Sequence, residues 1–200
     1  SIHEDNTLSK LMSHAELLLE FPESDITHSR LYELGFRLYG SYVTFNQPVW
    51  AITFASRLIK VFEVSRSQQF LGLPFLLLAS SKLNLGDYSS ARSYFEKQLA
   101  HEEKLGNKNG VARALGGLGS VASSLGNYPT SRDYYERQLS IFEELGRKDG
   151  VANALGELGD VASALGDYSA ARTYFEKQLA LEEELGRKNG ATGALSGLGH

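Results

Sequence analysis

The chain has 200 residues, of which 42% are hydrophobic and 22% charged, and this composition excludes a disordered chain. Its formal net charge of −4 argues against a nucleic-acid surface, which is normally basic. It has no cysteine, which excludes disulfides and cysteine zinc sites, and its longest apolar run, 70–79, is too short to span a bilayer. We therefore expect an intracellular, cytoplasmic protein that binds neither nucleic acid nor membrane.

Apolar residues at helical spacing mark the first elements of the chain. Between residues 8 and 20 they recur three or four apart, which predicts an amphipathic helix. We assign 1–26 to a partial or atypical N-terminal repeat helix. Helices near 28–44 and 49–64 are predicted next, and together they form a diverged repeat over 27–66.

From residue 67 onward, one block returns every forty residues. The phrase Leu85-Gly86-Asp87-Tyr88 recurs as Leu125-Gly126-Asn127-Tyr128 and as Leu165-Gly166-Asp167-Tyr168. A period in this range indicates stacked supersecondary units. We expect three of them, at 67–106, 107–146 and 147–186.

Each block divides into two helices. In the middle block the apolar residues of 110–125 fall on one helical face, and a second helix starts almost at once. Asn109 and Asn127 are the expected N-caps, Gly126 suits a left-handed helix end, and Pro129 falls in a first turn. The short break predicts an antiparallel hairpin.

The last segment, 187–200, is predicted to be the truncated first helix of a further repeat, which indicates a piece of a longer protein. Its apolar face, formed by Ala194, Leu195 and Leu198, has no evident partner. Such a helix would be frayed or would self-associate, because an uncapped end of a repeat array exposes a core face.

These blocks resemble the tetratricopeptide repeat (TPR) family, in the forty-residue form of the LGN/Pins-type adaptors. The first-helix signature is matched by Leu115, Leu118-Gly119 and Ala122, and again by Leu155, Leu158-Gly159 and Ala162. Second-helix positions match at Ser131 and Tyr135, and at Ala171 and Phe175, whereas Gln138 and Gln178 replace a family alanine. The resemblance implies an all-α, right-handed superhelical solenoid of antiparallel helix hairpins, with about ten helices.

The resemblance also implies a concave groove that binds a peptide or partner protein without catalysis. The polar groove positions are Arg113, Ser120, Ser124, Asn153, Glu157 and Asp160, and the apolar ones are Phe36, Leu73, Leu76, Leu77 and Leu83. The carboxylates favour a basic or amide-rich ligand with apolar anchors, although Arg113 pairing with one of them is an alternative. Helix 72–85 is apolar all round, so something should cover it.

Other chemistry is not indicated. The five histidines lack metal-ligand spacing and no nucleophile motif is present, so we expect no enzyme activity, cofactor or metal. The glutamates at 102–103, 143–144 and 182–184 are interpreted as a solvated outer face. Two alternatives to the adaptor remain: a regulatory sensor arm of a larger multidomain ATPase or transcription regulator, and a self-assembling repeat scaffold.

Overall fold

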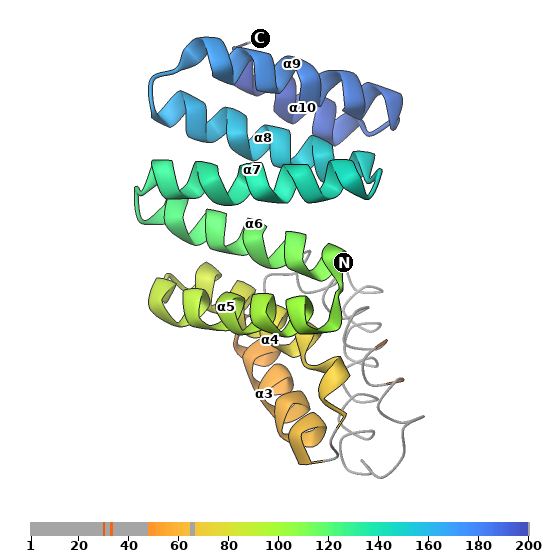
Figure 1. The fold of residues 1–200 in the computed structure, drawn as a ribbon. Helices are drawn as coiled ribbons and strands as arrows, with labels where there is room; N and C mark the ends of the chain where they lie inside the picture. The colour runs from red at the N-terminus through yellow and green to blue at the C-terminus, as the bar shows by residue number, and fades with distance from the viewer. Residues whose placement is uncertain (1–29, 31–32, 34–47, 65–66, 200) are drawn as a thin grey trace, which may run out of the picture. The chain divides into compact units, whose positions relative to one another are not determined.

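The computed structural model describes residues 30, 33, 48–64 and 67–199 (Figure 1). This part of the chain contains eight α-helices, α3 to α10, and one 3-10 helix, with no strand, so the all-α prediction is confirmed. None of these helices is both long and apolar enough to cross a membrane. The predicted helix at 8–20 lies outside the described residues, as does that at 28–44 apart from Arg30 and Glu33, and Phe36 is among the residues not described.

The chain divides into two compact units, 1–105 and 106–200. The first contains α3 (Pro48–Val64), η1 (Gln68–Phe70), α4 (Gly72–Asn84) and α5 (Tyr88–Leu105). Helix α3 confirms the helix predicted at 49–64. Helix α4 packs against both α3 and α5, so the α4–α5 hairpin has α3 beside it.

The apolar helix α4 is covered by its own unit. Leu73 and Leu77 form one core cluster with Phe54, Leu58 and other residues of α3. Leu73, Leu76 and Leu77 are all less than 5% exposed, whereas Leu83 is half-buried. Something was expected to cover this helix, and α3 of the same unit packs on it.

The second unit contains α6 (Lys108–Ser124), α7 (Tyr128–Glu144), α8 (Lys148–Ala164), α9 (Tyr168–Glu184) and α10 (Lys188–Gly197). Helices α6 and α7 pack as one hairpin and α8 and α9 as the next, while α7 packs on α8 and α10 packs on α9. Figure 1 shows these helices following one another through the unit. The helix pairs recur with the forty-residue blocks, although the exact repeat boundaries stay a prediction.

The helix ends follow from single residues. The backbone at Gly126 has φ 74°, in the left-handed region, and Asn127 N donates to Ala122 O at 2.9 Å, which closes α6 in a Schellman motif. Asn127 then caps α7 as predicted. The cap of α6 is Asn107, which accepts from Gly110 N at 3.2 Å, so the prediction of Asn109 was wrong by two residues.

Glycines let the aromatic rings of the second helices lie directly on the first helices. The Tyr135 ring of α7 lies against Gly119 of α6, where a Cβ atom would come within 2.7 Å of it. Phe175 of α9 lies against Gly159 of α8 in the same way. A larger residue at either glycine would displace the ring, so the Leu-Gly pairs serve helix packing.

Helix α10 has a partner within the chain, contrary to expectation. Ala194 is fully buried and Leu198 packs against the cluster that contains Phe175. Only Leu195 of the predicted apolar face is exposed, at 39%. The packing of α10 on α9 therefore accounts for most of the surface that had been expected to fray or associate.

Candidate functional site

Three polar side chains project from one face of α8. Asn153, Glu157 and Asp160 are each exposed, and their spacing of four and three residues places them along one helical stripe. Neither carboxylate forms an ion pair with any part of the chain that the structure describes. The alternative that Arg113 neutralises one of them is therefore excluded.

Glu157 is linked to a buried tyrosine. Burial raises the pKa of the Glu157 carboxyl, a hydrogen bond with Tyr135 lowers it, and the nearby charge of Asp160 raises it. Tyr135 is itself buried, and burial together with the Glu157 charge raises the pKa of its hydroxyl. The Tyr135 hydroxyl also lies 3.0 Å from Ser120 Oγ of α6. Polar groups of three successive helices therefore meet at this tyrosine.

Asp160 has no such link. Burial raises the pKa of its carboxyl, and its side chain makes no hydrogen bond or ion pair among the described residues. A partly desolvated carboxylate without a donor is energetically unfavourable. Of the predicted polar positions, Asp160 is consequently the one with most to gain from a cationic ligand.

The other predicted site residues differ in exposure and lie in both units. Ser124 is exposed, and Arg113 and Ser120 are half-buried on α6. The leucines Leu73, Leu76 and Leu77 are buried in the other compact unit, so they are core residues and not open apolar anchors. Neither unit brings leucine anchors and the α8 carboxylates together.

A pocket that was not predicted from the sequence opens between α8, α9 and α10. Its volume is about 620 Å³. Asn153 is the member that belongs to the predicted stripe. The lining residues are Asn153, Gln178, Glu182, Gly186, Arg187, Lys188, Asn189 and Gly190.

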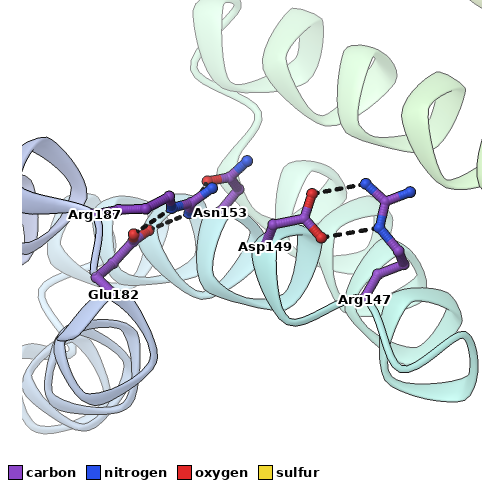
Figure 2. Close-up of polar contacts among 5 residues, drawn as sticks. All are labelled: Arg147, Asp149, Asn153, Glu182 and Arg187. Atoms are coloured by element: carbon purple, nitrogen blue, oxygen red, sulfur yellow. Dashed lines mark hydrogen bonds and ion pairs between the residues drawn. The ribbon is translucent and has the colours of Figure 1, made fainter. Parts of the chain in front are cut away.

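An ion pair between Glu182, which is buried, and Arg187, which is half-buried, lies among the residues that line the pocket, and Figure 2 shows the contacts of this pair. Glu182 is 1% exposed, and Arg187 donates to its two carboxylate oxygens at 2.6 and 2.5 Å. Arg187 also donates to Asn153 Oδ1 at 3.3 Å, which connects the pair to α8. The interpretation of Glu182 as a solvated outer residue was therefore wrong, as it was for Glu102, which is 3% exposed.

The preceding repeat has an apolar residue at the position of Glu182. Forty residues before Glu182 stands Phe142, which is buried, and Arg147 there pairs with Asp149 at 2.9 and 2.7 Å (Figure 2). The hydrogen bonds from Arg147 lower the pKa of Asp149 to about 2. The sequence signal that could have identified the pocket is the glutamate at an apolar stripe position with an arginine five residues later.

Two glutamine amides of the second helices lie against glycines of the first helices. The Gln178 amide lies against Gly156 and the Gln138 amide against Gly116, each where a Cβ atom would collide with it. In both, the Oε1 atom is buried and has no hydrogen-bond partner. The same holds for Gln98 Oε1, so the unpaired acceptor recurs at this position in three successive repeats. Side chains suited to hold a metal ion do not cluster anywhere in the described residues.

Stacked helix hairpins, in which aromatic rings of the second helices lie against glycines of the first, define a helical repeat protein. The tetratricopeptide repeat family model matches residues 73–137 and 110–184, and the chain belongs to this family. No curated protein sequence matches the chain.

Solved structures share the fold at low sequence identity. A Rap protein complexed with competence and sporulation factor has a TM-score of 0.80 at 20% identity, covering 92% of this chain and 50% of that chain. Aspartyl phosphate phosphatase F from Bacillus subtilis has a TM-score of 0.74 at 18% identity, covering 92% and 52%. BtubC (BKLC) from P. vanneervenii has a TM-score of 0.76 at 18% identity, covering 98% and 84%. The chain spans about half the length of the first two.

Proposed function

We propose that this chain is a non-catalytic protein-interaction module that binds a basic or amide-rich peptide segment along the inner face of its C-terminal unit. The inner face is defined here by Arg113, Ser120 and Ser124 of α6 and by Asn153, Glu157 and Asp160 of α8. The observation that carries the proposal is the pair of exposed carboxylates, Glu157 and Asp160, which lie three residues apart on α8 and have no ion-pair partner among the described residues. A ligand cation there would form charge-assisted contacts with them.

Two further observations support this proposal. Tetratricopeptide repeats are generally non-catalytic interaction scaffolds, and a Rap protein of the same fold was solved with competence and sporulation factor bound. Leu73, Leu76 and Leu77 are buried, so the proposal no longer includes them as apolar anchors for the ligand. Leu83 is half-buried and stays a candidate anchor, and Phe36 lies outside the described residues. We retain the LGN/Pins-like subtype and a cytoplasmic location as parts of the proposal.

The test is selection of peptide ligands from a random displayed library, followed by charge reversal. Asp160→Lys should weaken the selected peptides about tenfold or more, since a charge-assisted contact is worth roughly 1.5–3 kcal/mol. Glu183→Lys, at an exposed residue of α9, is the matched control and should bind as the parent does. Equal binding by both variants would reject the inner face as the binding surface.

A second candidate is a regulatory arm within a longer protein. It is favoured by the length comparison, since the chain spans about half of the Rap protein and of aspartyl phosphate phosphatase F. A third candidate, self-association through the C-terminal end, is favoured by the exposed Leu195 alone.

A further inference from the structure

Tyr135 differs from its counterparts in the neighbouring repeats by one hydroxyl group. Phe95 stands forty residues before it and Phe175 forty residues after it, and all three side chains are less than 5% exposed. The rings of Tyr135 and Phe175 lie against equivalent glycines of the first helices, Gly119 and Gly159. Because phenylalanine fills this position in the other two repeats, packing does not require the hydroxyl. Its hydrogen bonds are what distinguish this repeat.

The hydroxyl of Tyr135 joins two helix hairpins. Its oxygen lies 3.0 Å from Ser120 Oγ of α6, which belongs to the same hairpin. It is also hydrogen-bonded to the Glu157 carboxylate of α8, which belongs to the next hairpin. Burial raises the pKa of the Tyr135 hydroxyl, so the hydroxyl keeps its proton at neutral pH and can donate it to a carboxylate.

The repeat itself places residue 157 beside this hydroxyl. Gly197 of α10 stands forty residues after Glu157, just as Phe175 stands forty residues after Tyr135. A Cβ atom at Gly197 would come within 2.6 Å of Phe175 Cζ, the ring carbon that carries the hydroxyl in a tyrosine. The equivalent Cβ atom in the preceding repeat belongs to Glu157, so this side chain starts next to the Tyr135 hydroxyl.

The number of hydroxyl protons favours one direction of donation for each charge state of Glu157. Tyr135 and Ser120 carry one such proton each, and Ser120 Oγ also lies 3.0 Å from Gly116 O. Ionised Glu157 accepts the Tyr135 proton, and Ser120 then turns its proton from Gly116 O to the tyrosine oxygen. Protonated Glu157 instead donates to Tyr135, and the chain ends at Gly116 O. The ionised state has the stronger bond, because a charged acceptor shortens and strengthens it.

This bond leaves most of the carboxylate open to a ligand. A carboxylate has about four acceptor sites, and one hydroxyl occupies one of them. Glu157 is exposed and forms no ion pair with the described residues. We propose that Tyr135 is a positioning residue of the inner face, whose buried hydroxyl holds the Glu157 carboxylate in one orientation for a ligand cation. Ordering a side chain before binding reduces the entropy lost on binding. This inference rests on the proposed function.

Few groups act on the charge of Glu157. Burial raises the pKa of its carboxyl, the hydrogen bond with Tyr135 lowers it, and the charge of Asp160 on the same helix raises it. Arg113, the charged side chain of the inner face of α6, forms no ion pair with Glu157, and the side chain that α9 packs on Gly156 is the uncharged amide of Gln178. Loss of the Tyr135 hydroxyl would therefore leave only influences that raise the pKa of Glu157.

The first experiment titrates the Glu157 carboxyl by carbon-13 NMR in the full chain, without a ligand. Glu157→Gln identifies the signal by its absence. Tyr135→Phe should melt close to the parent, because phenylalanine fills the equivalent positions, and should move the Glu157 midpoint to higher pH. Tyr134→Phe is the matched control, since the half-buried Tyr134 of the same helix makes no hydrogen bond with the described residues. It should leave the midpoint unchanged.

The second experiment measures binding of acetylated trilysine amide to the same variants. Tyr135→Phe should weaken binding about fivefold, which corresponds to the net contribution of one hydrogen bond. Glu157→Gln should also weaken it. The double variant should bind no more weakly than Glu157→Gln alone, because the hydroxyl acts through the carboxylate. Tyr134→Phe should bind as the parent does.

The outcomes separate this inference from the proposed function. If Tyr135→Phe leaves the Glu157 midpoint where it is in the parent, the hydroxyl does not hold the carboxylate and the inference is wrong. If the midpoint rises but trilysine binds as tightly as before or more tightly, the hydroxyl does not prepare Glu157 for a cation. The inference is then also wrong, and the binding face stands. If the parent does not bind trilysine at millimolar concentration, the proposed function is wrong for basic peptides, whereas a raised midpoint would still support the positioning of Glu157 by Tyr135.

Discussion

At the scale of single residues, Phe175 joins three helices. Its ring lies between Gly159 of α8 and Gly197 of α10, and a Cβ atom at either glycine would come within 2.6 Å of it. Phe175→Ala should lower the free energy of unfolding by on the order of 3–5 kcal/mol, because a cavity would open at this junction. Glu183→Ala, on the exposed side of α9, should change it by less than about 0.5 kcal/mol. Urea unfolding of both variants checks this, and equal losses would contradict the packing.

Asp160 allows a prediction of the opposite sign. Burial raises the pKa of its carboxyl in the folded chain above the ordinary value of 3.8. The folded chain therefore binds a proton at this carboxyl more tightly than the unfolded chain does. The ionised carboxylate therefore opposes folding at neutral pH, and this penalty disappears as pH falls from the folded pKa to below the unfolded one. Asp160→Asn should raise the free energy of unfolding at pH 7, with no difference from the parent in strong acid. A variant that is less stable at pH 7 would show that Asp160 has a stabilising partner.

At the scale of elements, two successive repeats offer an exchange experiment. In the earlier repeat the Phe142 ring lies against Gly150, and Arg147 is hydrogen-bonded to Asp149. In the later repeat the Glu182 carboxylate lies against Gly190, and Arg187 is hydrogen-bonded to Glu182 itself. The double variant Glu182→Phe with Asn189→Asp should rebuild the earlier arrangement. Replacing a buried ion pair by apolar packing is often neutral or stabilising by roughly 1–4 kcal/mol. Glu182→Ala alone should destabilise the chain, because it removes one member of the pair. Thermal unfolding of the two variants tests this prediction. A double variant as unstable as Glu182→Ala would show that the two repeats are not structurally equivalent at this position.

The same elements show what could be predicted from the sequence. The periodic phrases determine hairpins, helix ends and the Asn127 cap, because these depend on residues close together in the chain. The burial of Glu182 was missed because it depends on Gly190 in the next helix, which leaves room for the carboxylate. The Gln178 amide was missed for the same reason, since its place depends on Gly156. A polar residue on an apolar stripe can be judged only against the helix that packs on it.

At the scale of the whole molecule, interactions recur at the spacing of the repeats. Lys108 pairs with Glu144 and Lys148 with Glu184, and all four side chains are more than half exposed. Exposed pairs contribute only about 0–1 kcal/mol, and salt screens them. Buried apolar contacts between successive helices therefore hold the C-terminal unit together, including those of α10 with α9.

Removal of α10 tests what this helix contributes to the C-terminal unit. A chain that stops at Arg187 loses Gly197 and Leu198 from the surroundings of Phe175, and Gly190 from those of Glu182. Uncovering one large apolar side chain costs roughly 1.5–3 kcal/mol, so the truncated chain should melt earlier than the parent. It should also associate as its concentration rises in sedimentation experiments, because an uncapped repeat exposes a core face. The full chain should not associate through this end, since Ala194 is fully buried and Leu198 packs against α9. Association of the full chain that Leu195→Glu abolishes would instead favour the self-assembling alternative.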